Sequence, residues 1–255
     1  MTPADAEIIA HRGFSAVAPE NTLAALAAAW DAGADAVEFD IHTAACGTPV
    51  LFHDDMLSRT TNGVGPLKRR TLAQLKRLDA GSWFGDGFAE ERIPTLAEAL
   101  EACADRPGPI YAEVKGFREL EDLDRMVRIA TEADLLDRTV FIAMNWTLLD
   151  RMRSQEPALR IGYIVDDADE VGEALVRARG DERALVDLRA SLLLEDDLLA
   201  ARFHAAGIPM AVWTVDSTSE ADALVAQRVG RITTNEVAAL LGWKRGGPAH
   251  PSGER

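Results

Sequence analysis

Charged and polar side chains follow several short apolar runs in this sequence. They form five groups: His11-Arg12, Glu38 with Asp40 and His42, His53-Asp54, Glu113 with Lys115, and Trp213-Thr214. Residues two apart on a strand share a face, so Glu38 and Asp40 are expected to point the same way. Two carboxylates at such short range repel each other unless a cation or shared protons lie between them. The first chemistry that the sequence suggests is therefore cation binding.

Glu113 follows another apolar run and supplies a third carboxylate, with no cysteine nearby. Carboxylate oxygens are the ligands of hard cations, so the set predicts one divalent cation, Mg²⁺ or Ca²⁺, rather than zinc. The alternative for Glu38 and Asp40 taken alone is a pair of solvated carboxylates at a strand end, which is common in an acidic protein.

Two histidines, His11 and His53, are also expected near the carboxylates. An isolated histidine is more often a core or surface residue, but two that converge on three carboxylates favour acid–base chemistry. Imidazoles titrate near neutral pH, so one can accept a proton while the other donates one. Arg12 and Lys115 would supply the positive charge that a phosphate group needs, Arg12 through its planar fork of donors.

The elements that must position these residues alternate short β-type runs with helical patterns. The expected strands are Ile8–Ala10, Ala36–Ile41, Pro49–Phe52, Ile110–Val114, Thr139–Ala143, Arg160–Val165, Ala184–Asp187, Met210–Val215 and Arg231–Thr233. The expected helices are Thr22–Asp31, Leu96–Ala104, Leu120–Ala133, Leu148–Ser154, Asp169–Ala178, Glu195–Ala206, Ser219–Ala226 and Val237–Leu241. Strands separated by such helices pair in parallel through right-handed crossovers.

One strand does not fit this alternation, because only residues 43–48 separate Pro49–Phe52 from the run before it. So short a connection makes a hairpin. With Cys46 and Gly47 as the central turn residues, positions whose numbers sum to 93 would lie opposite each other, and Asp40 would face His53.

Eight strands then remain for an α/β fold, a (β/α)₈ TIM barrel with a hairpin excursion after the second strand. Residues 54–94 become an insertion over the barrel mouth. Enzymes with this fold carry their active sites at the carboxyl ends of the strands, where the five groups occur. The alternative is an open doubly wound sheet, but the first strand–helix turn lacks the glycine fingerprint that such folds often carry.

Charge and composition limit the partners. Lys and Arg number 27 against 42 for Asp and Glu, and 27 − 42 gives a net charge of −15. Binding to nucleic acid or to an anionic membrane needs a basic face, so neither is expected. The two cysteines, Cys46 and Cys103, make no disulfide framework. With no signal-peptide pattern and no apolar run near ~20 residues, we expect a cytoplasmic protein without a membrane anchor. We expect one domain over residues 1–243 and a flexible tail over 244–255; a homo-oligomer stays open.

An ordered set of motifs resembles the glycerophosphodiester phosphodiesterase family over residues 8–241. The motifs are His11-Arg12-Gly13, Pro19-Glu20-Asn21-Thr22, Glu38-Phe39-Asp40-Ile41-His42, Pro49-Val50-Leu51-Phe52-His53-Asp54, Arg59-Thr60-Thr61-Asn62-Gly63, Leu78-Asp79-Ala80-Gly81-Ser82-Trp83-Phe84, Ile93-Pro94-Thr95-Leu96, Glu113-Val114-Lys115 and Trp213-Thr214-Val215. The resemblance implies a (β/α)₈ barrel and one divalent cation, Mg²⁺ or Ca²⁺. It also implies hydrolysis of glycerophosphodiesters, small-molecule substrates, to sn-glycerol 3-phosphate and an alcohol.

The resemblance also assigns roles to positions of this chain. It places the metal carboxylates at Glu38, Asp40 and Glu113, the acid–base pair at His11 and His53, the phosphate-side cations at Arg12 and Lys115, and a substrate-side aromatic at Trp213. Glu20 and Asn235 are further candidates, with Asn235 expected to orient rather than ligate. Residues 54–94 match the insertion of the glycerol-specific branch. Met144-Asn145-Trp146 departs from the family's usual Ser-Phe, and this change concerns the side of the pocket that is expected to hold the head group.

Two rival functions remain at this point. A related barrel phosphodiesterase acting on lysophospholipids should show an exposed apolar rim for the acyl chain. A non-catalytic metal- or phosphate-binding barrel would be favoured by loss of a histidine or carboxylate, and all five are present. The phosphorus could be attacked by water or by the glycerol hydroxyl beside the phosphoester. The resemblance favours the hydroxyl, which gives a cyclic phosphate that water then opens.

Overall fold

Nine strands of the described residues, 1–246, form one sheet in the computed structural model. Eight of them run parallel in the order β1-β9-β8-β7-β6-β5-β4-β2, and β1 also pairs with β2, so the sheet closes into a barrel. The strands are β1 Glu7–Ala10, β2 Ala36–Thr43, β3 Pro49–Leu51, β4 Ile110–Val114, β5 Thr139–Ala143, β6 Arg160–Val165, β7 Ala184–Arg189, β8 Met210–Trp213 and β9 Arg231–Thr234.

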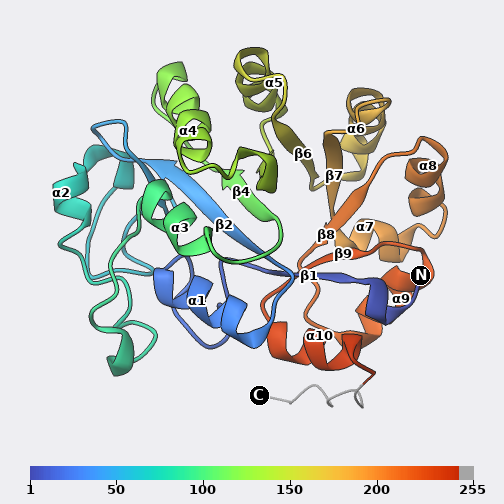
Figure 1. Ribbon diagram of the computed structural model, residues 1–255, viewed down its shortest axis with the longest axis horizontal. Helices are drawn as coiled ribbons and strands as arrows, with labels where there is room; N and C mark the ends of the chain where they lie inside the picture. Colours follow the sequence, from blue (N-terminus) through green and yellow to red (C-terminus); the bar gives the residue numbers. More distant parts are fainter. Residues whose placement is uncertain (247–255) are drawn as a thin grey trace.

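Helices cover the outside of this barrel (Figure 1). They are α1 Leu23–Ala32, α2 Leu72–Leu75, α3 Leu96–Cys103, α4 Leu120–Glu132, α5 Trp146–Gln155, α6 Val171–Ala178, α7 Ala190–Glu195, α8 Leu199–Ala205, α9 Thr218–Ala226 and α10 Val237–Lys244. The predicted (β/α)₈ barrel is confirmed. Within residues 1–246 no helix has the length and apolar character needed to cross a membrane.

Side-chain alternation along the strands explains why polar groups gather at one end of the barrel. Ile9, Tyr111 and Leu185 belong to a buried apolar cluster that fills the barrel interior. Two residues farther along the same strands as Tyr111 and Leu185, on the same face, come Glu113 and Asp187. The interior therefore has an apolar lower layer and, toward the carboxyl ends of the strands, a layer of carboxyl groups.

The hairpin forms, but its predicted register is wrong. The antiparallel pairs of β2 and β3 are Ile41↔Leu51, His42↔Val50 and Thr43↔Pro49, whose numbers sum to 92 rather than 93. The loop has three residues, 45–47, with Gly47 in the left-handed region at φ 82°, a common three-residue hairpin geometry. Phe52 N–H donates to Asp40 O at 3.0 Å, so Phe52 lies opposite Asp40 and His53 comes one position later.

Residues 54–94 build a small core together with the hairpin. Leu57, Leu67 and Leu75 are almost fully buried and pack with Val50 and Phe52 of the hairpin. None of the residues that line the central cavity belongs to this insertion. The insertion therefore packs on the hairpin and contributes no side chain to this cavity, and its placement over the mouth stays a prediction.

Two smaller differences concern helices. The helix expected over Glu195–Ala206 is α8, which begins later, at Leu199, and α7 precedes it at residues 190–195, where no helix was expected. The Asp196 carboxylate accepts the Leu198 N–H at 2.9 Å in the turn between α7 and α8. Helix α10 continues to Lys244, whose ammonium pairs with Asp35 at 2.7 Å, so the predicted tail begins later than residue 244. The rest of that tail, residues 247–255, lies outside the described residues.

Candidate active site

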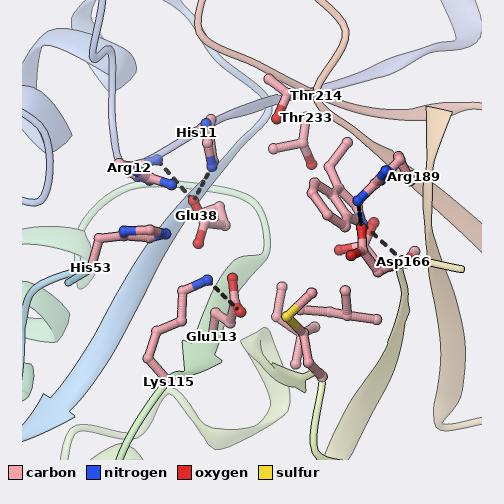
Figure 2. A pocket seen from close by; sticks show the side chains of 15 residues that line it. His11, Arg12, Glu38, His53, Glu113, Lys115, Asp166, Arg189, Thr214 and Thr233 are labelled. Atoms are coloured by element: carbon pink, nitrogen blue, oxygen red, sulfur yellow. Dashed lines mark hydrogen bonds and ion pairs between the residues drawn. The ribbon is translucent and has the colours of Figure 1, made fainter. Parts of the chain in front are cut away.

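A cavity of about 340 Å³ opens at the carboxyl ends of the barrel strands. Seven predicted site residues line it: His11, Arg12, Glu38, His53, Glu113, Lys115 and Trp213. Figure 2 shows His11, Arg12 and His53 around Glu38 on one side, with Glu113 and Lys115 close by. Asp40 is fully buried beside them. Glu20 and Asn235 lie behind this group and contact it through hydrogen bonds.

The three predicted metal carboxylates converge. Glu38, Asp40 and Glu113 each offer an oxygen atom, and these oxygens lie within 4.8 Å of one another. Their residues are 3%, 0% and 9% exposed. Glu38 and Asp40 share one face of β2, and Glu113 lies opposite Asp40 on the adjacent β4. The strand pattern that predicted a shared face is therefore confirmed as geometry.

The electrostatics of the cluster show strong mutual repulsion. Burial, followed by the charges of Asp40 and Glu113, raises the pKa of Glu38 well above its usual value. Burial and the Asp40 charge likewise raise the pKa of Glu113 to about 7. Burial also acts to raise the pKa of Asp40, but Arg12 and Lys115 outweigh it and lower that pKa. Asp40 thus keeps its negative charge while its two neighbours resist ionisation.

The cluster also has the donor chemistry of a hard-cation site. Glu38 Oε1 and Asp40 Oδ1 are buried and have no hydrogen-bond partner among residues 1–246. Their other oxygens are used: Glu38 Oε2 accepts the Arg12 N–H at 2.8 Å, and Asp40 Oδ2 accepts from Asn21 at 2.7 Å. Buried acceptors without a donor are costly. A cation bound among all-oxygen ligands would satisfy both, so the residues fit Mg²⁺ or Ca²⁺.

His11 is held in one orientation by Asn235. Asn235 Nδ2 donates to Asp216 at 2.8 Å, which turns its Oδ1 toward His11 Nδ1, also at 2.8 Å. The proton is therefore assigned to Nδ1, and Nε2, 4.0 Å from Glu38, keeps its lone pair. Burial and the Arg12 charge lower the pKa of His11, so the ring is neutral near pH 7. The arrangement suits a proton acceptor.

His53 is held by a different set of charges. Its Nδ1 lies 2.6 Å from Asp54 Oδ1. Arg59 donates from Nε and Nη2 to Asp54 and also makes two bonds to Glu20. Hydrogen bonds from Arg59 hold the pKa of Asp54 well below its usual range, so Asp54 is a carboxylate. The Asp54 carboxylate at Nδ1 therefore fixes the orientation of the His53 ring.

Arg12 connects the two sides of the site. Its guanidinium contacts Glu20 at 2.8 Å and Asp40 at 3.2 Å. The next residue must be glycine, because a Cβ on Gly13 would lie 2.5 Å from the backbone carbon of Ala25. This close approach to α1 brings the Arg12 N–H onto Glu38. The sequence motif His11-Arg12-Gly13 thus has a packing reason for its third member.

Lys115 is the second cation at the cavity. Its ammonium lies 2.8 Å from Glu113 and 3.6 Å from Asp40. Burial lowers its pKa, but the charges of Asp40 and Glu113 outweigh this and raise the pKa. Lys115 therefore stays protonated, and with Arg12 it offers positive charge to an anionic group in the cavity.

The opposite wall of the cavity holds residues that the sequence reasoning missed. Arg189 pairs with Asp166 there (Figure 2), and its guanidinium carbon lies 5.9 Å from the centre of the Trp213 ring. Asp187 lies deeper and is 3% exposed. Burial, followed by the Glu113 charge, raises the pKa of Asp187 to about 8. A signal was present, because Asp187 ends a predicted strand, where polar residues are candidates.

Comparison with known proteins agrees with this geometry. The model of the "Glycerophosphoryl diester phosphodiesterase family" matches residues 11–239. A "Glycerophosphodiester phosphodiesterase" of Caldanaerobacter subterraneus subsp. tengcongensis is 31% identical over 244 residues, which cover 94% of this chain and 98% of that relative. The chain belongs to the glycerophosphoryl diester phosphodiesterase family. It is therefore a phosphoric diester hydrolase that acts on glycerophosphodiesters.

Solved structures give the same fold. A phosphodiesterase from Oleispira antarctica, in complex with the product sn-glycerol-3-phosphate, has a TM-score of 0.85 and 32% identity, covering 93% of this chain and 96% of that chain. A glycerophosphodiester phosphodiesterase from Agrobacterium tumefaciens has a TM-score of 0.80 and 26% identity, covering 97% and 100%. The resemblance seen in the motifs is thus confirmed for family, fold and enzyme class.

Proposed function

We propose that this enzyme hydrolyses glycerophosphodiesters to sn-glycerol 3-phosphate and an alcohol, with one divalent cation, Mg²⁺ or Ca²⁺, held by Glu38, Asp40 and Glu113. The observation that carries the proposal is the cluster of three buried carboxyl groups at a cavity that two histidines and two basic side chains, Arg12 and Lys115, also line. The product complex of the Oleispira antarctica protein supports the same product here. A bound cation would stabilise the negative charge that develops on the phosphoryl group.

The surroundings of the two histidines support different roles for them. His11 is neutral with Nε2 open to the cavity, so it would accept the proton of the attacking hydroxyl. His53 is backed by ionised Asp54, so it would donate a proton to the departing alcohol. The roles would reverse when water opens a cyclic phosphate. Arg12 and Lys115 would hold the phosphate, and Trp213 would pack against the substrate.

The nucleophile we propose is the glycerol hydroxyl beside the phosphoester. Because this hydroxyl belongs to the substrate, its attack on the phosphorus is intramolecular. Holding it close to the phosphorus lowers the entropic cost of reaching the transition state. The test is a glycerophosphocholine analogue in which hydrogen replaces the 2-hydroxyl. Its hydrolysis should be lost. Near-normal turnover of the analogue at a similar KM would show that water attacks directly.

The metal assignment is tested by assaying glycerophosphocholine with Mg²⁺, Ca²⁺ and Mn²⁺ and in excess EDTA. We expect no turnover in EDTA with the circular-dichroism spectrum unchanged. Glu38→Gln keeps the shape of the side chain and removes its charge, so it should weaken metal binding. A higher metal concentration should then be needed for the half-maximal rate. Full activity in EDTA would contradict the proposal.

One observation favours a second candidate, action on lysophospholipids. A groove of about 310 Å³ shares Glu113, Lys115 and Met144 with the mouth of the site. Its wall includes Phe117, 37% exposed, and Met144 is 46% exposed. These two exposed apolar side chains are what supports an acyl-chain contact at this groove. Lysophosphatidylcholine turnover at a kcat/KM above that of glycerophosphocholine, reduced by Phe117→Ser, would establish this alternative.

A cytoplasmic location also stays a proposal. It is supported by the two cysteines, which are unbridged in the structure, because disulfides are rare where thiols are kept reduced. Fractionation of cells that produce the protein would test it.

A further inference from the structure

Asp187 lies at the floor of the cavity without an evident structural function. It is on the interior face of β7, between Ile164 of β6 and Ala211 of β8. The residue is 3% exposed and lines the cavity. Its Oδ1 is buried and has no hydrogen-bond partner within residues 1–246. A buried carboxyl oxygen without a partner is costly, so a native structure retains one mainly where something else binds it.

An internal ion pair does not account for this residue. No basic side chain of residues 1–246 lies within salt-bridge distance of Asp187. Arg189 follows two positions later but pairs with Asp166 at the rim, and Lys115 pairs with Glu113. The walls near Asp187 are apolar, with Ile142 2% and Ile164 4% exposed. The isoleucines beside Asp187 therefore offer no hydrogen bond, and the Thr233 hydroxyl is a further polar group of the same cavity.

The depth of the cavity indicates which part of a substrate reaches this floor. The leaving alcohol differs from one diester to another and needs the open side, where Met144 and the Arg189 side chain are 46% and 49% exposed. The glycerol half is constant and small, so it fits the closed side. Burial of its hydroxyl among isoleucines is unfavourable unless the hydroxyl has a partner. Among the residues just described, Asp187 can supply that partner.

We propose that Asp187 binds the terminal hydroxyl of the glycerol half, the one that is not beside the phosphoester, and so selects substrates with an unsubstituted glycerol. This inference rests on the proposed function and adds a specificity-determining residue to it. A hydroxyl is both donor and acceptor, so it matches either protonation state of a carboxyl group. A 1-acyl lysophospholipid has an ester at this oxygen, and Asp187 would exclude it.

The test compares two diesters that share the hydroxyl beside the phosphoester. One is glycerophosphocholine, and the other is 2-hydroxypropyl phosphocholine, which lacks only the terminal hydroxyl. In the unchanged enzyme we expect kcat/KM to favour glycerophosphocholine by roughly 10²-fold, since a site that binds a hydroxyl rejects the analogue lacking it. In Asp187→Leu the ratio should fall to near one, through loss on glycerophosphocholine alone. Asp187→Asn keeps hydrogen-bonding capacity and should keep most of the ratio.

Asp166→Asn is the matched control, because Asp166 is a carboxylate of the same cavity that lies at the rim and pairs with Arg189. It should leave the ratio of the two substrates as in the unchanged enzyme. If Asp187→Leu does not fold, Asp187→Ala gives the same comparison. A ratio that is unchanged, or an equal loss on both diesters, would overturn the inference. Failure of the unchanged enzyme to hydrolyse glycerophosphocholine would instead overturn the proposed function.

Discussion

At the scale of single residues, the two histidines differ in what holds them. His11 is fixed by the neutral amide of Asn235, and His53 by the carboxylate of Asp54. The neutral amide acceptor at Nδ1 of His11 leaves the lone pair on Nε2, whereas the group at Nδ1 of His53 is a carboxylate. The different partners at Nδ1 support the different roles that we propose for the two histidines.

The first prediction concerns Asn235. Removal of the amide in Asn235→Ala leaves the His11 tautomer unfixed, so kcat should fall roughly 10- to 100-fold with KM little changed. The hydrogen bond that His11 donates to Asn235 acts to raise the pKa of His11. The neutral form is lost as pH falls through that pKa, so the acid limb of the kcat profile should move to lower pH. Ser15→Ala is the control, since Ser15 donates to the same Asn235 oxygen at 3.0 Å. An unchanged kcat would contradict this role.

The second prediction concerns the stability of the metal-free protein at different pH values. The folded-state pKa of Asp187 is about 8, against ~3.9 for an exposed aspartate. Between these values the folded state binds more protons than the unfolded state, so the contribution of Asp187 to stability falls as pH rises. Asp187→Asn does not titrate and should be more stable by on the order of 5 kcal/mol at pH 8. Thermal melts in EDTA would measure this, and a stability difference independent of pH would refute it.

At the scale of elements, strand positions could be predicted well, because each buried strand is a short β-type run bounded by turn residues. Helix α7 was not predicted, and α8 begins later than predicted, because the Asp196 side chain accepts the Leu198 N–H and holds a turn between them, which periodicity does not show. The hairpin register depended on whether the loop has two or three residues. Gly47 is compatible with a two-residue and with a three-residue loop, and the observed hydrogen bonds show that the loop has three residues.

The third prediction concerns how the insertion supports the site. The insertion sends no side chain into the cavity. Within it, however, Arg59 binds Asp54, the partner of His53, and also Glu20 outside the insertion. Arg59→Gln should free Asp54 to move and lower kcat roughly 10-fold, with little effect on the choice between glycerol and aryl diesters. Arg70→Gln is a matched control, because Arg70 bonds the Val64 carbonyl within the insertion. A change in selectivity with unchanged kcat would favour the predicted cover instead.

At the scale of the whole molecule, the strand-end rule found most of the candidate site from sequence. The polar residues that follow β-type runs include Glu38, Glu113 and Lys115, and the sequence alone predicted them as site residues. The rule reached Asp187 only as the last letter of an apolar run, and its significance comes from a missing partner, which is a property of packing. Arg59 was part of a recognised motif, but its bridge between Asp54 and Glu20 depends on segments that meet only in the folded barrel.

The last prediction joins the acidic cluster to the stability of the whole protein. In a chain of net charge −15, Glu38, Asp40 and Glu113 place three mutually repelling carboxyl groups in the interior. A cation that binds the folded but not the unfolded chain stabilises it, by about 2.7 kcal/mol at a concentration 100 times the Kd. For a domain of this size that is a rise in Tm of roughly 5–10 °C.

The measurement is Tm against the concentration of Mg²⁺, Ca²⁺ or Mn²⁺, starting from EDTA-treated protein. The double variant Glu38→Gln with Glu113→Gln should have a higher Tm in EDTA, because burial and the neighbouring carboxylates raise the pKa of both groups, and it should lose the rise with metal. Asp137→Asn, an exposed carboxylate far from the cluster in sequence, controls for general charge screening and should keep the full rise. Equal metal-induced shifts in the double variant and the unchanged enzyme would mean that the cation binds elsewhere.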